Sequence, residues 1–223
     1  MHPLTRFIRA ELEGAARPQD AAAMYAYMKG VQPFRGVKTP ARREIVRRAH
    51  ARFDLEARCA YDTVVRELWS GTYREERYAA LDLAAHYRRF HTLAALPLLE
   101  ELLAGTDWWD VLDPLATGLL GKLLRAQGDT LRARARVWNA APHLWTRRAA
   151  ILVQLGHKRD TDPALLEEIL ASRLHEQEFF IRKAVGWALR EYAKTDPGWV
   201  QDFVARHAEQ ICALSRREAL RHL

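Results

Sequence analysis

The segment YAALDLAAHY (78–87) carries the pattern on which the fold prediction rests. Its apolar residues recur three and four positions apart, as they do along one face of an α-helix. Two later segments, RRAAILVQLGHK (147–158) and IRKAVGWALREY (181–192), share its plan. Each begins at or beside a basic residue, has a middle of small residues and ends in polar ones. This similarity indicates a repeated helical unit.

The composition of the whole chain also predicts helices, because 36 Ala and 30 Leu greatly outnumber the 17 residues that are Val or Ile. No segment predicts a strand, and about a dozen helices joined by short turns are expected. Thr39-Pro40 predicts a capped helix start, and Thr72-x-x-Glu75 and Ser215-x-x-Glu218 are capping-box patterns. Helix pairs that bury their apolar stripes only against neighbouring pairs predict an all-α, HEAT-like superhelix (an α-solenoid) over a single domain, residues 1–223. Its concave face would follow a long partner, and a compact helical bundle is the alternative.

Composition limits the class of protein. A chain of 223 residues with 49% hydrophobic residues has enough apolar material for a core. The first residues, MHPLTRFIRAELEG, lack the apolar run of a signal peptide, and no later segment has the uncharged length that spans a bilayer. We therefore expect a cytoplasmic protein without membrane contact. Cys59 and Cys212 are far apart, and we expect two buried thiols rather than a disulfide.

Charge leaves two interpretations open. The net charge is +7, and 29 of the 35 basic residues are Arg. Arg suits phosphate because its planar fork donates two parallel hydrogen bonds, so a polyanionic partner is one explanation. A general bias of composition toward Ala and Arg is the other.

Several kinds of catalytic site are excluded by their missing residues. The stretch Gly118–Lys122 lacks the spacing and the Ser or Thr of a phosphate loop, and we expect it inside a helix. None of the three serines lies in a G-x-S-x-G turn. The nine histidines show no i, i+4 pairing on a helix, so we expect no metal site.

The stretch TDWWDVLDPL (106–115) is unusual because two tryptophans and three carboxylates fall within it. If Thr106 caps a helix, Trp109 and Asp113 lie one turn apart on one face. Asp107 and Asp110 would fall in the first turn, where the helix dipole favours their charge. Asp113 has no such structural explanation and is a candidate functional carboxylate. For Trp109 the alternative to a functional role is packing in the core.

A second unusual segment is EFFIRKAVGWALREYAKT (178–195). Gly186 precedes Trp187 in mid-helix, where glycine costs about 1 kcal/mol relative to alanine and usually reflects a close backbone approach. Aromatic side chains here are interleaved with basic ones, a mixture typical of protein surfaces that bind nucleic acid. An amphipathic helix with solvated charges is the alternative.

Together these segments resemble the AlkD-like family of bacterial HEAT-repeat alkylpurine DNA glycosylases, which are DNA alkylation repair enzymes. The resemblance runs over nearly the whole chain, through MYAYMKGVQPFRGVKTPARRE, VVRELW, ERYAALDLAAHY, LEELL, WWDVLD, LWTRRAAIL and EFFIRKAVGWALREYAKT. It implies a monofunctional glycosylase that hydrolyses the N-glycosidic bond of cationic N3- and N7-alkylated purines in double-stranded DNA. It also implies a basic concave DNA-binding face and no metal or organic cofactor. We expect a monomer, associated with the nucleoid when bound to DNA.

The family's motifs assign site residues one by one. WWDxxD matches Trp109 and Asp113, LWxRRAAI matches Arg148, and KAxGWxLRE matches Trp187; these four are the expected catalytic residues. Asp113 would stabilise the sugar cation or activate water, and Arg148 would hold a phosphate or position Asp113. The resemblance also places DNA contacts at Tyr27, Thr39, Arg43, Phe180 and Arg190.

Pro114 is a departure from the expected pattern, because proline disfavours a helical residue before it. Either the helix kinks, or it stops near Leu112 and restarts with Asp113 as its cap. Two other functions compete with the glycosylase: a noncatalytic helical-repeat protein that binds nucleic acid, and a protein-interaction scaffold. A plain nucleic-acid binder has no use for a carboxylate that faces DNA, so the simultaneous presence of Trp109, Asp113, Arg148 and Trp187 favours the enzyme.

Overall fold

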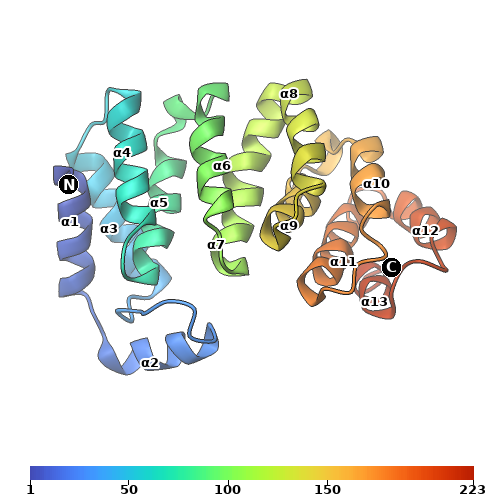
Figure 1. Ribbon diagram of the computed structural model, residues 1–223, viewed down its shortest axis with the longest axis horizontal. Coiled ribbons are helices and arrows are strands. Elements are labelled where there is room, and N and C mark those ends of the chain that lie inside the picture. The colour runs from blue at the N-terminus through green and yellow to red at the C-terminus, as the bar shows by residue number, and fades with distance from the viewer. The chain divides into compact units, whose positions relative to one another are not determined.

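A computed structural model describes residues 1–223, which form helices and turns without any strand. The all-α fold class is confirmed (Figure 1). The α-helices are α1 (Pro3–Gly14), α2 (Pro18–Tyr27), α3 (Thr39–Arg52), α4 (Arg58–Trp69), α5 (Arg74–His86), α6 (Leu96–Ala104), α7 (Trp109–Pro114), α8 (Gly121–Asn139), α9 (Leu144–Leu152), α10 (Pro163–Ala171), α11 (Phe179–Ala193), α12 (Pro197–Arg206) and α13 (Ala213–Ala219). Short 3-10 turns, η1 (Arg88–Phe90), η2 (Leu93–Ala95) and η4 (Lys158–Asp160), and one π-helix, η3 (Leu115–Leu120), complete the chain.

These helices form two compact units, Met1–Leu98 and Leu99–Leu223. Apolar stripes at helical spacing build the core of each. In α4, for example, Tyr61, Val64, Val65 and Leu68 recur at three- and four-residue steps, and all are at most 1% exposed. Each such stripe packs on neighbouring helices, as the repeat pattern predicted. The expectation of one domain over residues 1–223 stays a prediction.

Unit 1 contains one helix with no buried residue, α2, which Figure 1 shows apart from the other helices of the unit. The loop after it is anchored by Glu75, a side chain with no exposed surface. The Glu75 Oε1 accepts hydrogen bonds from the backbone N–H groups of Arg35, Gly36 and Val37 at 2.8 to 3.0 Å. The predicted capping box of Thr72 and Glu75 is therefore wrong, because Glu75 binds a distant loop. The residue that reaches back toward its own helix start is Glu76, 3.5 Å from the Tyr73 N–H.

In unit 2, α11 packs closely against α13. A Cβ atom added at Gly186 would lie 2.6 Å from the Glu218 Cβ and 3.0 Å from the Ser215 carbonyl oxygen. Gly186 therefore permits the close approach that its mid-helix position predicted. The second predicted capping box, Ser215 with Glu218, is wrong. Cys212 is the N-cap of α13, the Ser215 hydroxyl donates to the Arg182 carbonyl, and Glu218 forms ion pairs with α11.

Pro114 does not interrupt the chain of helical residues. It has α-helical dihedral angles at the end of α7, and the chain continues directly into η3 and then α8. The distortion is a π-helix, in which the Thr117 hydroxyl donates to the Asp113 carbonyl at 2.8 Å. Of the two alternatives for Pro114, the restart with Asp113 as a cap is wrong. Gly118–Lys122 lies within the helical run, as predicted.

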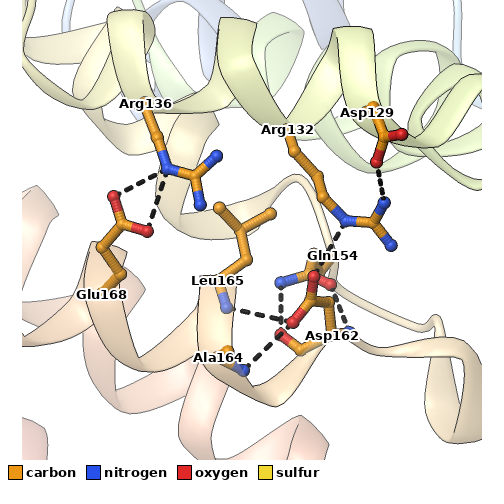
Figure 2. A network of polar contacts seen from close by, with 8 residues as sticks. All are labelled: Asp129, Arg132, Arg136, Gln154, Asp162, Ala164, Leu165 and Glu168. Carbon is orange, nitrogen blue, oxygen red and sulfur yellow. Dashed lines mark hydrogen bonds and ion pairs between the residues drawn. The ribbon is translucent and has the colours of Figure 1, made fainter.

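Ion pairs connect helices that are about one repeat apart in sequence. Figure 2 shows two of them, in which Arg132 and Arg136 of α8 bind Asp162 and Glu168 at α10. Related pairs separated by 28 to 40 positions are Arg42–Asp82, Arg147–Glu176, Arg148–Asp113 and Arg190–Glu218. Many arginines thus link neighbouring helices. The two cysteines are free thiols, but the expectation that both are buried is wrong because Cys59 is exposed.

Candidate active site

The short helix α7 presents the first two candidate residues. It begins at Trp109, with Trp108 as N-cap in an extended conformation. We expected Thr106 to be the cap of this helix, and this is wrong. The Thr106 hydroxyl donates instead to the Leu102 carbonyl of α6 at 3.0 Å. Trp109 and Asp113 are both half-buried and one helical turn apart, so they share a face of α7. The shift in helix start leaves their predicted relationship unchanged.

Arg148 of α9 binds Asp113 through both carboxylate oxygens. The Nε donates to Oδ1 and the Nη2 donates to Oδ2, each at 2.9 Å. The third guanidinium nitrogen, Nη1, donates to the backbone carbonyl of Phe180 at the start of α11, at 2.6 Å. The Arg148 side chain is 6% exposed and that of Asp113 is 14% exposed. One guanidinium therefore fixes the carboxylate of α7 against two other helices.

The environment of Asp113 acts on its pKa in opposing directions. Burial raises the pKa of the Asp113 carboxyl above its ordinary value, and the nearby Asp110 charge adds to the rise. The hydrogen bonds and positive charge of Arg148 lower it in opposition. The net direction is upward, because burial has the largest effect.

An aromatic cluster includes the side chain of Phe180, whose backbone carbonyl Arg148 binds. The rings of Trp108, Trp145 and Phe180 lie within 5.0 to 5.6 Å of one another, centroid to centroid, in tilted and edge-on arrangements. The exposed Phe179 packs edge-on against Phe180. Neither Trp108 nor Trp145 was among the site residues predicted from the sequence. Trp145 precedes Arg148 by three residues in LWTRRAAIL, so the motif that pointed to the arginine contained the signal.

Trp187 lies on α11, two turns after Phe180. A separation of seven residues returns to nearly the same helix face, about 10.5 Å farther along the axis. Trp187 is half-buried, and no ring contact joins it or Trp109 to the aromatic cluster. The structure therefore brings Asp113, Arg148 and the Phe180 backbone into direct contact, and it leaves both tryptophans partly accessible.

The other predicted DNA contacts are distributed over both units. In unit 1, Tyr27 ends α2 with 71% of its surface exposed, Thr39 is the first residue of α3, and Arg43 has a side chain that is 69% exposed. In unit 2, Arg190 pairs with Glu218 and its side chain is 23% exposed. Thr39 had been expected to cap α3, but the N-cap is Lys38.

Comparison with known proteins identifies the family of the chain. The sequence pattern of the family described as DNA alkylation repair enzyme matches residues 8–223. The chain belongs to the DNA alkylation repair family. A predicted DNA alkylation repair enzyme from Enterococcus faecalis has 29% identity and a TM-score of 0.86, over 93% of this chain and 96% of that one. A search of curated proteins gave no match.

Two solved structures from Streptococcus mutans, AlkD2 and smu.31, also share the fold of this family member. Both are 15% identical to this chain, with TM-scores of 0.62 and 0.63. The matches cover 92% and 99% of this chain, and 98% and 100% of theirs. The helical-repeat fold and the family resemblance drawn from the sequence are confirmed.

The family member has no helix that is both long and apolar enough to span a membrane. It also has no group of three or more His, Cys, Asp or Glu side chains arranged to hold a metal ion.

Proposed function

We propose that this DNA alkylation repair protein is a monofunctional DNA glycosylase. Its substrate would be double-stranded DNA that carries a purine alkylated at N3 or N7, and its reaction is hydrolysis of the N-glycosidic bond. The observation that carries the proposal is the Asp113 carboxylate, which is held by two hydrogen bonds from Arg148 one turn from Trp109. The family assignment supports a role in alkylation damage.

The chemistry of the substrate explains why one anchored carboxylate is enough. A purine alkylated at N3 or N7 carries a positive charge, so its bond to the sugar is already weakened. The base departs as a neutral molecule and needs no protonation by an enzyme acid. What the enzyme must stabilise is the oxocarbenium-like sugar, whose positive charge develops at C1′ as the bond breaks. A fixed anion beside C1′ lowers the energy of that state.

Arg148 is a positioning residue in this mechanism. All three of its guanidinium nitrogens bind protein oxygens, and its side chain is 6% exposed. These contacts favour the positioning of Asp113 over the alternative role, which was to hold a DNA phosphate. The guanidinium fixes the direction of the carboxylate before the substrate binds, so little reorganisation is needed during the reaction.

The same contacts bear on how Asp113 acts. Each carboxylate oxygen keeps a lone pair after it accepts from Arg148, so Asp113 can still accept a hydrogen bond from the attacking water. The hydrogen bonds from the guanidinium hold both oxygens in fixed directions, and they oppose the rise in the Asp113 pKa that burial causes. We therefore assign electrostatic stabilisation of the sugar cation as its main role and orientation of water as a second one.

Trp109 and Trp187 would hold the lesion. Both are half-buried on helices that contribute to the Asp113 and Arg148 contacts. The faces of their indole rings attract cations by about 0.5 to 2 kcal/mol each. Binding of this kind favours an alkylated nucleotide, which is positively charged, over a normal one.

The direct test is release of base from alkylated duplex DNA. Purified protein is expected to release free 7-methylguanine or 3-methyladenine, measured by chromatography under single-turnover conditions, with the same rate in the presence of EDTA. Undamaged duplex of the same sequence is the control. If neither base is released while DNA binding persists, the protein is a noncatalytic nucleic-acid binder and the proposal fails.

A further inference from the structure

The connection between α9 and α10 presents two basic side chains from an unusual backbone. Lys158, at the start of η4, has a φ of 56°, in the left-handed region that residues other than glycine seldom adopt. This conformation costs about 1 kcal/mol or more and persists only where the surroundings enforce it. Gly156, two residues earlier, also has a positive φ of 80°. The chain therefore makes a tight and costly turn at Lys158 and Arg159.

A clamp of hydrogen bonds holds the two ends of this turn together, as Figure 2 shows. The Gln154 side chain donates to the Asp162 carbonyl at 3.1 Å and accepts from the Asp162 N–H at 2.7 Å. Asp162 also caps α10 through Ala164 and Leu165 and binds Arg132 of α8 at 2.8 Å. These contacts fix the turn to α8 and α10 before any ligand arrives.

Lys158 and Arg159 line an open cleft of about 580 Å³. Two further cations of the cleft wall are paired with acids, Arg125 with Asp160 and Lys194 with Glu191. In contrast, the side chains of Lys158 and Arg159 are exposed and form no hydrogen bond or ion pair with the protein. The cleft therefore carries an excess of positive charge on an immobilised turn, which is the requirement for binding a phosphate group.

His157 also lines this cleft but adds no positive charge to it. It is buried, and its Nε2 lies 3.0 Å from the Gly121 carbonyl, to which it donates in the tautomer that satisfies both atoms. Burial, followed by the nearby Arg125, lowers the pKa of the His157 imidazole; the hydrogen bond to the Gly121 carbonyl and the charge of Asp160 oppose this effect. At neutral pH the cleft's charge comes from its lysines and arginines.

The cleft lies in line with the candidate active site along α11. Phe180, Trp187 and Lys194 follow at intervals of seven residues, so they lie along nearly one face of this helix. Phe180 accepts a hydrogen bond from Arg148, and Lys194 borders the cleft. From Trp187 to Lys194 the helix advances about 10.5 Å, close to the axial rise of three base pairs.

We propose that the turn at Lys158 and Arg159 is a phosphate-binding subsite that takes one backbone phosphate of the same DNA duplex, about three nucleotides from the lesion. The proposal rests on the proposed function, because that function supplies the position of the lesion. The subsite adds affinity and register, and it takes no part in breaking the glycosidic bond.

The test combines a charge-removing variant with single neutral phosphates. The variant is Lys158→Asn with Arg159→Gln, because asparagine tolerates the left-handed backbone. Kd is measured on duplexes that hold one tetrahydrofuran abasic analogue and one methylphosphonate at each position in turn. For the unaltered protein, a methylphosphonate about three nucleotides from the analogue should weaken binding roughly tenfold, the loss of one charge-assisted contact. In the variant the same methylphosphonate should have no further effect, and the salt slope of binding should fall by about 1.

The matched control removes the same charge elsewhere in unit 2. Arg216→Gln with Arg217→Gln alters two exposed cations on α13, outside the cleft, and should leave the effect of that methylphosphonate intact. A control variant that loses the effect of the methylphosphonate equally overturns the proposal. A set of duplexes in which no methylphosphonate has an effect that depends on Lys158 and Arg159 overturns it too. So does binding of inorganic pyrophosphate that depends on Lys158 without any coupling to DNA. Because the binding assay needs no excision, an inactive enzyme would refute the proposed function alone.

Discussion

Replacement of Asp113 by asparagine tests the site most directly, because it removes the negative charge and keeps nearly the same volume. In the structure this carboxylate neutralises Arg148, whose side chain is 6% exposed. The amide oxygen of the introduced asparagine could accept from only part of the guanidinium fork. The variant would therefore leave a buried positive charge without its partner, in addition to removing the anion that faces the substrate.

The cost in stability can be worked from this contact. Loss of one partner of a buried ion pair usually costs about 3–5 kcal/mol. Asp113 keeps 14% of its side chain exposed and asparagine keeps one acceptor, so we expect about 2–4 kcal/mol. For a chain of this size that loss corresponds to a melting temperature lower by roughly 5–15 °C. Had Asp113 been a helix cap, Asp113→Asn would have cost about 1 kcal/mol or less.

A second variant separates stability from catalysis. Asp113→Asn with Arg148→Met removes both charges and replaces the guanidinium by an apolar chain of similar length. It should recover most of the lost melting temperature, while the rate of base release stays at least roughly a hundredfold below that of the unaltered protein. Calorimetry and single-turnover excision at saturating enzyme measure the two effects. Recovery of the rate together with the stability would show that the pair is only structural.

Other consequences of the site can be measured in the same assays. Asp113 must be ionised to act, and its pKa is raised, so the rate of base release should fall with decreasing pH at a midpoint above the ordinary value of 3.8. Arg148→Met removes the guanidinium that lowers the Asp113 pKa, so this midpoint should move to higher pH. Trp109→Ala and Trp187→Ala should each slow excision by about 2- to 30-fold and weaken lesion binding, with no change in binding to undamaged duplex. The product strand should stay intact until treated with alkali, and trapping of a protein–DNA adduct by borohydride would contradict the monofunctional assignment. Gly186→Ala should lower the melting temperature by a few degrees, because its Cβ would press on Glu218; an unchanged or higher value would show that α13 moves away freely.

The sequence predicted the helices well and their ends less well. Periodicity and the excess of Ala and Leu identify helices, because both reflect local geometry and burial. Capping patterns depend on whether a side chain has a better partner elsewhere. Glu75 binds the backbone of residues 35–37, and Glu218 binds Lys183 and Arg190. Both acids are committed to partners that lie dozens of positions away, which no local pattern reveals.

The candidate site was predictable as a set of residues and not as a geometry. Spacing placed Trp109 and Asp113 on one face of a helix, and this holds although the helix begins later than predicted. The ion pair of Asp113 with Arg148 spans 35 positions and depends on the packing of α7 against α9, so spacing could not distinguish it from a phosphate contact. The π-helix after Pro114 was not predicted either. It begins at Leu115, directly after Pro114, and the helical run continues through both; π-helical turns are frequent at functional sites.

The arginine content has an explanation that neither interpretation of the charge included. Pairs such as Arg132–Asp162 and Arg136–Glu168 link a helix to one in the next repeat, so each repeat of the chain needs its own cations and acids. A basic residue is therefore weak evidence for DNA contact until its partners are known. Arg190 illustrates this, because Glu218 already occupies it. The chain has a net charge of +7, so some basic side chains have no acidic partner in the protein. Lys158 and Arg159 are among them, and such side chains are the ones available to bind phosphate. Since each bound phosphate adds about 0.9 to the salt slope, removing an unpaired cation should change that slope and removing a paired one should change mainly the melting temperature.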